Sequence, residues 1–139
     1  MNDGEGIDGL TGWLGLRWEA ADRVRLEIRP EHINPAGLLS GGVAYAMVDY
    51  CMGSALWREL DEDERIATIG ISISYVRTAR RGGVVCEARL NRRNDRVGVL
   101  SAEVRDEEDR LLATAIGSFS IFPKERLEGH GKRPAASGA

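Results

Sequence analysis

The alternation of apolar and polar residues marks out several β-strands along the chain. Val24, Leu26 and Ile28 alternate with charged residues, a period of two that predicts a strand with one solvent-facing side. A weaker strand is expected just before it, over 16–20, and Pro30 ends the pair. Four further strand-like runs follow in the second half of the chain, over 69–75, 84–90, 100–104 and 111–122.

Short polar segments separate these four runs. They lie at 78–83, 91–96 and 106–110 and have the length of hairpin connections, so consecutive strands are expected to pair as antiparallel neighbours. The last run, over 111–122, is apolar on both faces and is therefore expected to be covered from both sides.

A different periodicity occupies the middle of the chain. Apolar residues recur at helical spacing from Gly41 to Leu60, and Ser40 is placed as the N-cap of this helix. Apolar positions run all round it, which predicts that both of its flanks are covered. The stretch 38–57 is long enough to span a bilayer, but its glycines and serines and its central Asp49 favour a buried helix of a globular domain.

The order of elements is therefore one or two strands, a long helix and four strands. One helix against five or six antiparallel strands makes an α+β domain, which we expect over residues 13–123. The Gly- and acid-rich segment 1–12 is expected to be a flexible N-terminus, and the segment 124–139 a disordered tail. A single helix cannot cover both faces of the sheet, so the architecture also predicts a homo-oligomer.

Length and charge narrow the class of protein. A chain of 139 residues is one domain, and a net charge of −3 disfavours a general nucleic-acid binder. Two cysteines and two histidines cannot build a zinc site of Cys and His ligands, and they indicate a reducing cytoplasm rather than a disulfide scaffold. The acidic N-terminus is unlike a signal peptide, and the excess of arginine over lysine is typical of a GC-rich bacterial genome.

The segment 32–42 contains the candidate chemistry. A polar loop there leads to the pair Gly41-Gly42 at the start of the long helix, where unpaired N–H groups and the positive helix end attract a developing negative charge. Both glycines also let a ligand carbonyl approach the backbone closely. Asp49, two turns further along, is an ionisable residue in an apolar helix, where burial favours a reactive role.

Asp49 and Gly41 cannot act on one carbonyl group within the same chain. Eight residues separate them, which is about 12 Å along a helix axis at 1.5 Å per residue. Either the two groups are unrelated, or two copies pack so that Asp49 of one faces Gly41 of the other. The second alternative agrees with the expected oligomer.

Taken in order, the loop, the glycine pair and the aspartate resemble a known family, the hotdog-fold acyl-CoA thioesterases, and most closely their phenylacetate-degradation and hydroxybenzoyl-CoA types. The resemblance covers residues 14–123. It is carried by Asn34, Gly37, Gly41-Gly42, Asp49, the strand exit at 75–79 and the turn at 81–83.

The resemblance implies a hotdog fold, in which the sheet wraps round the long helix, and the hydrolysis of acyl-CoA to a free acid and coenzyme A. It implies that the Gly41 N–H polarises the thioester carbonyl and that Asn34 positions this carbonyl or the attacking water. Asp49 of a partner subunit would be the nucleophile or the general base. Thr68 matches the position of a water-holding Ser or Thr. No metal or redox cofactor is implied, and coenzyme A enters only as part of the substrate.

Two positions depart from the family pattern. Ser40 stands where a histidine commonly precedes the glycine pair, and it is either a helix cap only or part of the catalytic site. Gly53 stands one turn past Asp49, where other members carry a threonine. Either change is expected to lower the activity or to alter the substrate.

Coenzyme A needs cations for its phosphates, and arginines cluster between residues 77 and 96. Seven arginines and two acidic residues lie there, which predicts a phosphate-binding rim, with a solvated strand face as the alternative. Tyr45 shares the Asp49 face of the helix and is a candidate neighbour of the acyl group, although a place in the core or an interface competes. The candidate substrate-binding residues are Gly42, Tyr45, Arg77, Arg80, Arg81, Arg92 and Arg93.

Two other functions compete with thioester hydrolysis. A hotdog dehydratase acting on a hydroxyacyl thioester would need a histidine paired with an acid, and His32 fits that pattern poorly. A non-catalytic acyl-CoA-binding or regulatory protein is favoured by Ser40 and Gly53. No serine-hydrolase elbow, P-loop or dinucleotide motif occurs. We therefore predict a cytoplasmic thioesterase that binds acyl-CoA, associates with itself into a dimer or tetramer, and contacts neither nucleic acid nor membrane.

Overall fold

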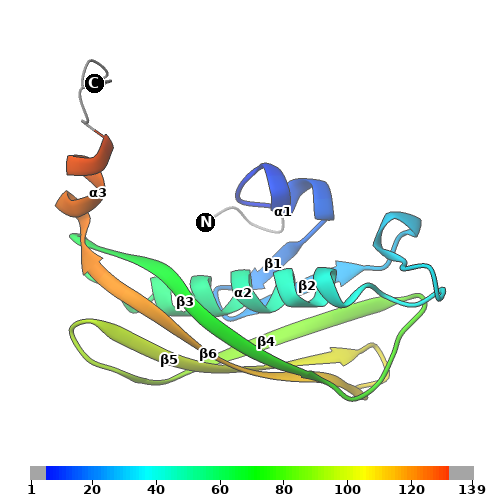
Figure 1. Cartoon of the computed structure of the whole chain (residues 1–139). Coiled ribbons are helices and arrows are strands. Elements are labelled where there is room, and N and C mark those ends of the chain that lie inside the picture. The colour runs from blue at the N-terminus through cyan, green and yellow to red at the C-terminus, as the bar shows by residue number, and fades with distance from the viewer. Residues whose placement is uncertain (1–5, 132–139) are drawn as a thin grey trace.

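The computed structural model describes residues 6–131, and for 128–131 only the backbone. Six antiparallel strands form one sheet, and a long helix, α2, lies across one of its faces (Figure 1). This is the predicted α+β arrangement. In chain order the elements are α1 (Gly9–Leu14), β1 (Arg17–Ala20), β2 (Arg23–Glu27), the 3-10 turn η1 (Pro30–His32), α2 (Gly41–Trp57), β3 (Glu64–Tyr75), β4 (Gly83–Arg93), β5 (Val97–Asp106), β6 (Leu111–Pro123) and α3 (Lys124–Gly131).

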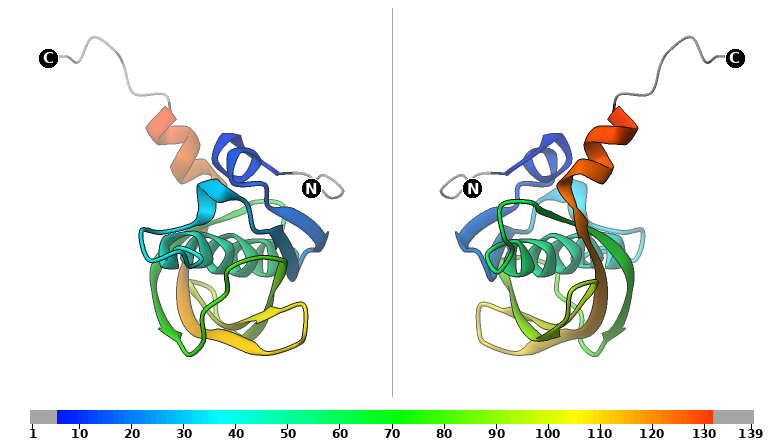
Figure 2. Two further views of the ribbon diagram at one scale, coloured as in Figure 1. Left: turned by 90° about the vertical axis from the view of Figure 1, so that its right-hand side faces the viewer. Right: turned by 90° about the vertical axis from the view of Figure 1, so that its left-hand side faces the viewer.

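Helix α2 occupies the hollow of the curved sheet, and the strands bend round it (Figure 2). Met47, Val48, Cys51 and Met52 are fully buried between helix and sheet. Each such side chain contributes about 1.5–3 kcal/mol through the apolar area that it removes from water. This burial anchors α2 on the sheet. Within residues 6–131, no helix is long and apolar enough to cross a membrane.

The strand order differs from the predicted one at β3. Strands β4, β5 and β6 form two consecutive hairpins, as the polar turns after β4 and β5 predicted. The order in the sheet, however, is β1-β2-β4-β5-β6-β3, so the hairpin predicted at 78–83 is wrong. The connection is long enough for this crossing. The seven residues 76–82 span about 23 Å when extended, whereas the three strand spacings from β3 to β4 take about 14 Å.

This crossing makes β3 an edge strand that pairs with β6 alone. Thr68 lies opposite Phe119, and Tyr75 lies opposite Ala113. Strand β6 is interior, but only α2 covers it in a single chain, because its outward-facing Ile116 is 63% exposed. The expectation that the last strand is covered on both faces is therefore not met within one copy.

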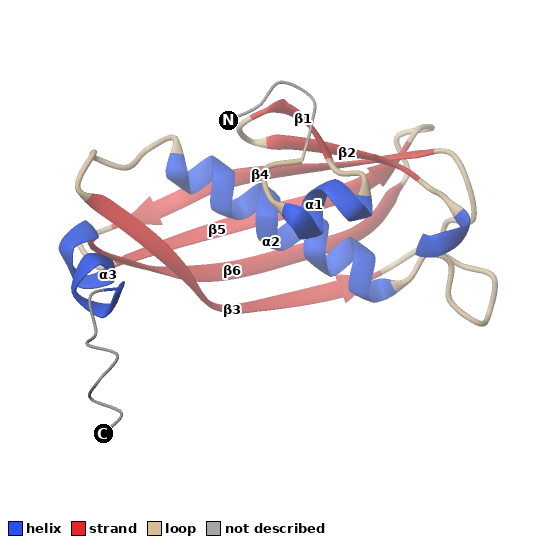
Figure 3. Ribbon diagram, turned by 90° about the horizontal axis from the view of Figure 1, so that it is seen from above, coloured by secondary structure: helices blue, strands red, loops and turns tan. Residues whose placement is uncertain are grey.

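The termini also differ from the prediction. Part of the segment 1–12 that was expected to be flexible is ordered, because the Asp8 carboxylate caps α1 and Thr11 completes a capping box. Helix α1 lies over α2 on the side away from the sheet (Figure 3). Residues 124–131, expected to be disordered, form α3 after the end of β6. The remaining parts of both predictions, 1–5 and 132–139, lie outside the described residues.

Candidate active site

The first turn of α2 presents one backbone donor that the protein itself leaves unused. The Ser40 hydroxyl oxygen accepts a hydrogen bond from the Gly42 N–H at 3.2 Å, so Ser40 is the N-cap that the sequence predicted. The Ser40 carbonyl accepts from the next two N–H groups, those of Val43 and Ala44. No hydrogen bond among the described residues uses the Gly41 N–H. A ligand oxygen at this helix end therefore has Gly41, rather than Gly42, as its available donor.

Tyr75 fixes this turn from the neighbouring strand. Its hydroxyl donates a hydrogen bond of 2.6 Å to the Gly41 carbonyl oxygen. A Cβ atom at residue 41 would come within 3.2 Å of the tyrosine ring, a tight contact that favours glycine at this position. Burial, and then the nearby Tyr45, raise the pKa of the Tyr75 hydroxyl, which keeps it a donor. In the sequence Tyr75 stands out only as part of the strand exit at 75–79, and no motif signals this contact.

Asn34 lies beside Gly41 in a small pocket of about 170 Å³ that also includes Tyr75 and Arg77. The Asn34 side-chain oxygen accepts hydrogen bonds from the Ala36 N–H at 2.9 Å and the Leu38 N–H at 3.1 Å, which shapes the loop before α2. Its side-chain amide group is left as the donor that can reach a ligand. The structure thus brings Asn34 and Gly41 together on one pocket.

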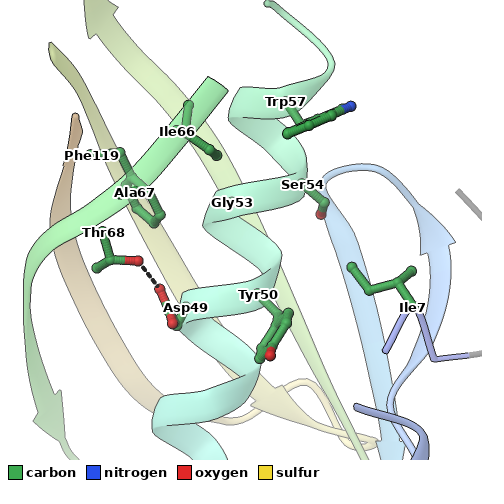
Figure 4. Close-up of a pocket in the computed structure, with 10 residues that line it drawn as sticks. All are labelled: Ile7, Asp49, Tyr50, Gly53, Ser54, Trp57, Ile66, Ala67, Thr68 and Phe119. Atoms are coloured by element: carbon green, nitrogen blue, oxygen red, sulfur yellow. Dashed lines mark hydrogen bonds between the residues drawn. The ribbon is translucent and has the colours of Figure 1, made fainter. Parts of the chain in front are cut away.

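Asp49 lies two turns further along α2 and is half-buried, not deeply buried as its helix predicted. Its Oδ1 atom accepts a hydrogen bond of 2.7 Å from the Thr68 hydroxyl of β3 (Figure 4). This bond orients the carboxylate, and no hydrogen bond among the described residues uses its second oxygen. The contact places Thr68 beside the carboxylate, and the predicted role of Thr68 in holding a water stays a prediction.

A larger pocket of about 460 Å³ opens next to this pair. One end carries the Asp49 carboxylate and the Thr68 hydroxyl, and the rest is mainly apolar (Figure 4). Two of its other polar groups are bound by the protein: the Ser54 hydroxyl bonds to the Ala21 carbonyl, and the Tyr50 hydroxyl bonds to Asp8. The pocket is lined by Ile7, Asp49, Tyr50, Gly53, Ser54, Trp57, Ile66, Ala67, Thr68 and Phe119.

The two halves of the candidate site do not meet within one chain. The pocket of Gly41 and Asn34 and the pocket of Asp49 and Thr68 have no lining residue in common. The Gly41 and Asp49 positions are about 12 Å apart along the axis of α2. One copy therefore holds two separate halves, a donor half at Gly41 and a carboxylate half at Asp49.

Comparison with known proteins identifies the family. The family model described as thioesterase superfamily matches residues 36–113, a range that contains Gly41, Asp49, Thr68 and Tyr75. The chain belongs to the thioesterase superfamily. The strands and α2 that form both halves of the site lie largely within the matched range, whereas α1 precedes it.

Similar proteins support this assignment. A candidate esterase of Deinococcus radiodurans is 32% identical over 117 residues, which cover 80% of this chain and 73% of the relative. A medium/long-chain acyl-CoA thioesterase of Escherichia coli is 29% identical over 97 residues, which cover 60% of this chain and 63% of the relative. The crystal structure of a thioesterase from Haemophilus influenzae, 21% identical, superposes with a TM-score of 0.81 over 85% of each chain. The fold of this thioesterase-superfamily protein is thus the predicted hotdog fold.

The arginines of this thioesterase-superfamily protein divide into different environments. Arg93 forms a two-bonded ion pair with Glu64, at 2.9 Å and 3.1 Å, and this hydrogen bonding lowers the pKa of the Glu64 carboxyl. The internal partner argues against the predicted role of Arg93 in binding phosphate. Arg77 is exposed beside the Gly41 pocket. The remaining candidates of the predicted rim are exposed: Arg80, Arg81 and Arg92.

Two further residues are placed by this thioesterase fold away from catalysis. Tyr45 is 37% exposed on α2 and lines neither pocket half, so it is not a wall of the acyl pocket within one chain. His32 is buried; its Nδ1 accepts from the Arg29 N–H at 2.9 Å, and its Nε2 lies 2.7 Å from the Leu14 carbonyl oxygen. With both ring nitrogens engaged, His32 fixes the loop and is not free to act as the base of a dehydratase.

Proposed function

We propose that this protein hydrolyses the thioester of an acyl-CoA to a free acid and coenzyme A, at a site shared between two subunits. The observation that carries the proposal is the Asp49–Thr68 pair, which closes one end of an otherwise apolar pocket. Such a pocket fits an apolar acyl group whose reactive carbonyl lies at the carboxylate. The acyl-CoA activity of the Escherichia coli relative supports the same substrate class.

The chemistry follows from the two halves. The Gly41 N–H, at the positive end of α2, would polarise the thioester carbonyl and stabilise the oxyanion that forms on it. As a general base, Asp49 would take a proton from water while the water oxygen attacks the carbonyl carbon; the C–S bond then breaks and the thiolate of coenzyme A takes the proton. As a nucleophile, an Asp49 oxygen would instead attack the carbonyl carbon and expel the coenzyme A thiolate, which forms a mixed anhydride. Water then cleaves the anhydride to the free acid and the Asp49 carboxylate, and the released proton goes to the thiolate. In both cases Thr68 holds one carboxylate oxygen and leaves the other toward the reaction.

A second copy can complete the site through the exposed edge of β3. Ile69 and Tyr75 are 60% and 52% exposed on this strand, an apolar edge of the kind that pairs with another chain. Within one copy Tyr75 binds Gly41 and Thr68 binds Asp49. An antiparallel pairing with Tyr75 opposite Thr68 of the other copy therefore brings each Gly41 toward the partner subunit's Asp49.

This arrangement defines a twofold axis. On β3 the axis falls at Ser72, midway between Thr68 and Tyr75 once the bulge between Thr68 and Gly70 is taken into account. On α2 it falls at Tyr45, midway between Gly41 and Asp49. We assign Tyr45 to the interface for this reason, and not to the substrate-binding role that the sequence analysis gave it.

The direct test is the release of coenzyme A from a panel of straight-chain and aromatic acyl-CoAs. Turnover of any of them supports the proposal, and turnover of the aromatic ones supports the finer prediction of a phenylacetate- or hydroxybenzoyl-type enzyme. Thermal stabilisation by acyl-CoA without turnover would overturn it in favour of a non-catalytic binding protein.

Mixed oligomers test the shared site. Asp49→Asn and Gly41→Ala variants are expected to be poorly active alone, and to regain about a quarter of the wild-type activity when co-refolded, since half of the dimers are mixed and each has one intact site. The matched control pairs Asp49→Asn with Thr68→Val. Both of these changes affect the same half-site, so no mixed dimer has an intact site and no activity returns. Equal recovery in both mixtures, or none in the first although differently tagged subunits co-purify, would overturn the shared site.

A further inference from the structure

We infer that Ile7 is a wall of the acyl pocket and limits the length of the acyl chain, and that the Asp8–Tyr50 hydrogen bond holds the segment of Ile7 in place. The inference rests on the proposed function, because it assigns the apolar part of the Asp49 pocket to the acyl group. Ile7 is the one lining residue that comes from outside α2 and the sheet (Figure 4).

Hydrogen bonds of Ile7 and of the next residue, Asp8, fix the position of Ile7. Its backbone N–H donates to the Thr11 hydroxyl at 2.8 Å, and Thr11 is fully buried. The neighbouring Asp8 uses both carboxylate oxygens: Oδ1 accepts from the Thr11 N–H at 2.8 Å, and Oδ2 accepts from the Tyr50 hydroxyl at 2.8 Å. One carboxylate thus caps α1 and ties it to α2, next to Asp49.

The opposite part of the pocket is kept open by Gly53. A Cβ atom at this position would meet only Phe119, at 3.8 Å, which is an ordinary contact. Packing therefore does not require glycine here, although glycine is unfavourable within a helix compared with alanine. The space beside Gly53 is continuous with the pocket that Ile7 closes, and it is available to a ligand.

The chemistry of the lining identifies the ligand group. Trp57, Ile66 and Phe119 surround the part of the pocket beyond Asp49, and Trp57 is held under the Arg65 guanidinium at 5.2 Å. The Ser54 and Tyr50 hydroxyls are bound elsewhere, so this region is mainly apolar, and the Trp57 indole N–H is its remaining side-chain donor among the described residues. It fits an apolar acyl chain that extends from the carbonyl at Asp49 toward Ile7.

Substitutions on the two sides of the pocket should act in opposite directions. Ile7→Ala removes part of the wall, and Tyr50→Phe removes its tie while keeping the ring, so both should shift the preference toward longer chains. Gly53→Ala and Gly53→Leu fill the pocket and should shift it toward shorter chains. Burial of one methylene corresponds to about a fourfold change in affinity, which sets the expected step per carbon. Leu10→Ala is the matched control, since Leu10 is 50% exposed on α1 and does not line the pocket.

The experiment measures kcat/KM over straight-chain acyl-CoAs of increasing length and, independently of catalysis, the Kd of the corresponding free fatty acids by calorimetry. Opposite shifts for Ile7→Ala and Gly53→Ala, with Leu10→Ala like the wild type, support the inference. Wild-type hydrolysis with an unshifted length profile in all variants would overturn the inference alone. A shifted Kd series without hydrolysis by the wild type would overturn the proposed function but support the pocket wall.

Discussion

The Tyr75 hydroxyl donates a 2.6 Å hydrogen bond to the carbonyl oxygen of Gly41, and the tyrosine ring lies 3.2 Å from the position that a Cβ atom at residue 41 would take. The end of β3 thereby holds the first turn of α2 and the direction of its free Gly41 N–H. The donor half of the site depends on this contact, because a backbone donor can be aimed only by fixing the backbone.

The glycine pair should therefore respond unequally to the same substitution. Gly41→Ala places a methyl group 3.2 Å from Tyr75 and must displace either the ring or the helix turn, whereas at Gly42 the nearest atom, the Ser40 hydroxyl oxygen, lies 3.6 Å away. We expect Gly41→Ala to lower kcat by up to about 100-fold, as for the loss of an oxyanion donor, and Gly42→Ala to leave it within a few-fold. Similar kcat values for the two variants would contradict this assignment of the donor.

The carboxylate half gives a graded pair of variants. Asp49→Asn should lower kcat by about 100-fold or more through loss of the general base or nucleophile. Thr68→Val should lower it by about 10- to 100-fold, since a hydrogen bond to a charged group is worth about 1.5–3 kcal/mol. Thr114→Val, on the outer face of β6, is the matched control and should leave kcat unchanged. A Thr68→Val enzyme as active as that control would show that the 2.7 Å bond has no part in the reaction.

Ser40 is expected to act through helix capping. Ser40→Ala loses the hydrogen bond to the Gly42 N–H and should lower the free energy of unfolding by about 1 kcal/mol, whereas Ser40→Asn keeps a capping oxygen and most of that stability. Chemical denaturation followed by circular dichroism measures both. If Asn destabilises the protein as much as Ala does, the cap is not the stabilising interaction.

Two arginines of the predicted rim should have different roles: Arg93 should contribute to stability, and Arg77 should contribute to substrate binding. Arg93→Ala breaks the partly buried pair with Glu64 and should cost about 1–2 kcal/mol of stability, between the values for exposed and buried pairs, without raising KM. Arg77→Ala should leave the stability unchanged and raise KM for acyl-CoA about tenfold, as expected for a lost contact to phosphate. A rise of KM in Arg93→Ala, with Arg77→Ala unaffected, would reverse the assignment.

The tie between α1 and α2 should be visible in a pH titration. Burial, and then the hydrogen bond to Asp8, raise the pKa of Tyr50 from 10.0 to about 12. The folded state thus favours the protonated tyrosine, so the associated stability is present below pH 10 and is lost as the pH rises toward about 12. The phenolate absorbance of the wild type should include a tyrosine that ionises in this range. Tyr50→Phe should remove it and flatten the loss of stability, and an unchanged curve would contradict the tie.

At acid pH the same Asp8–Tyr50 hydrogen bond contributes through Asp8, whose pKa is lowered rather than raised. The Thr11 N–H and the Tyr50 hydroxyl lower the pKa of Asp8 below its ordinary value of 3.8, so its contribution is present above that value and is lost as the pH falls through the lowered pKa. Asp8→Asn, which retains capping ability but not the charge, should lose less stability on acidification than the wild type does.

Much of the fold could be predicted from local patterns. The alternation of apolar residues located the strands, and the all-round apolar helix with Ser40 before it located α2, because both features are encoded in neighbouring residues. The pairing of β3 with β6 was missed, because a connection of seven residues fits a hairpin and a crossing equally well. Order in α1 was missed although its capping box, Asp8 and Thr11, is local in sequence; only the second contact of Asp8, to Tyr50 42 residues away, lies beyond a local pattern.

The residues of the candidate site could be predicted where the residue type itself indicates the chemistry, as with a carboxylate or a glycine at a helix start. Gly41 and Asn34 line one pocket and Asp49 and Thr68 line the other, and the catalytic roles of all four stay predictions. Tyr75 was overlooked as a partner of Gly41 because the signal is a distance between β3 and α2, not a motif. Arg93 looked like its neighbours until Glu64, 29 residues earlier, was found to bind it.

The placement of β3 beside the last strand has a consequence for how the protein is made. Thr68 can be held at its final position only when Phe119 has entered the sheet opposite it, about 50 residues later in synthesis. Until β6 emerges, α2 and β3 are joined by local contacts alone, and non-local pairing of this kind slows folding. The nascent chain therefore acquires its Asp49–Thr68 pair among the last events of folding. Truncation within β6 should abolish the pair even though every residue of both half-sites has already been synthesised.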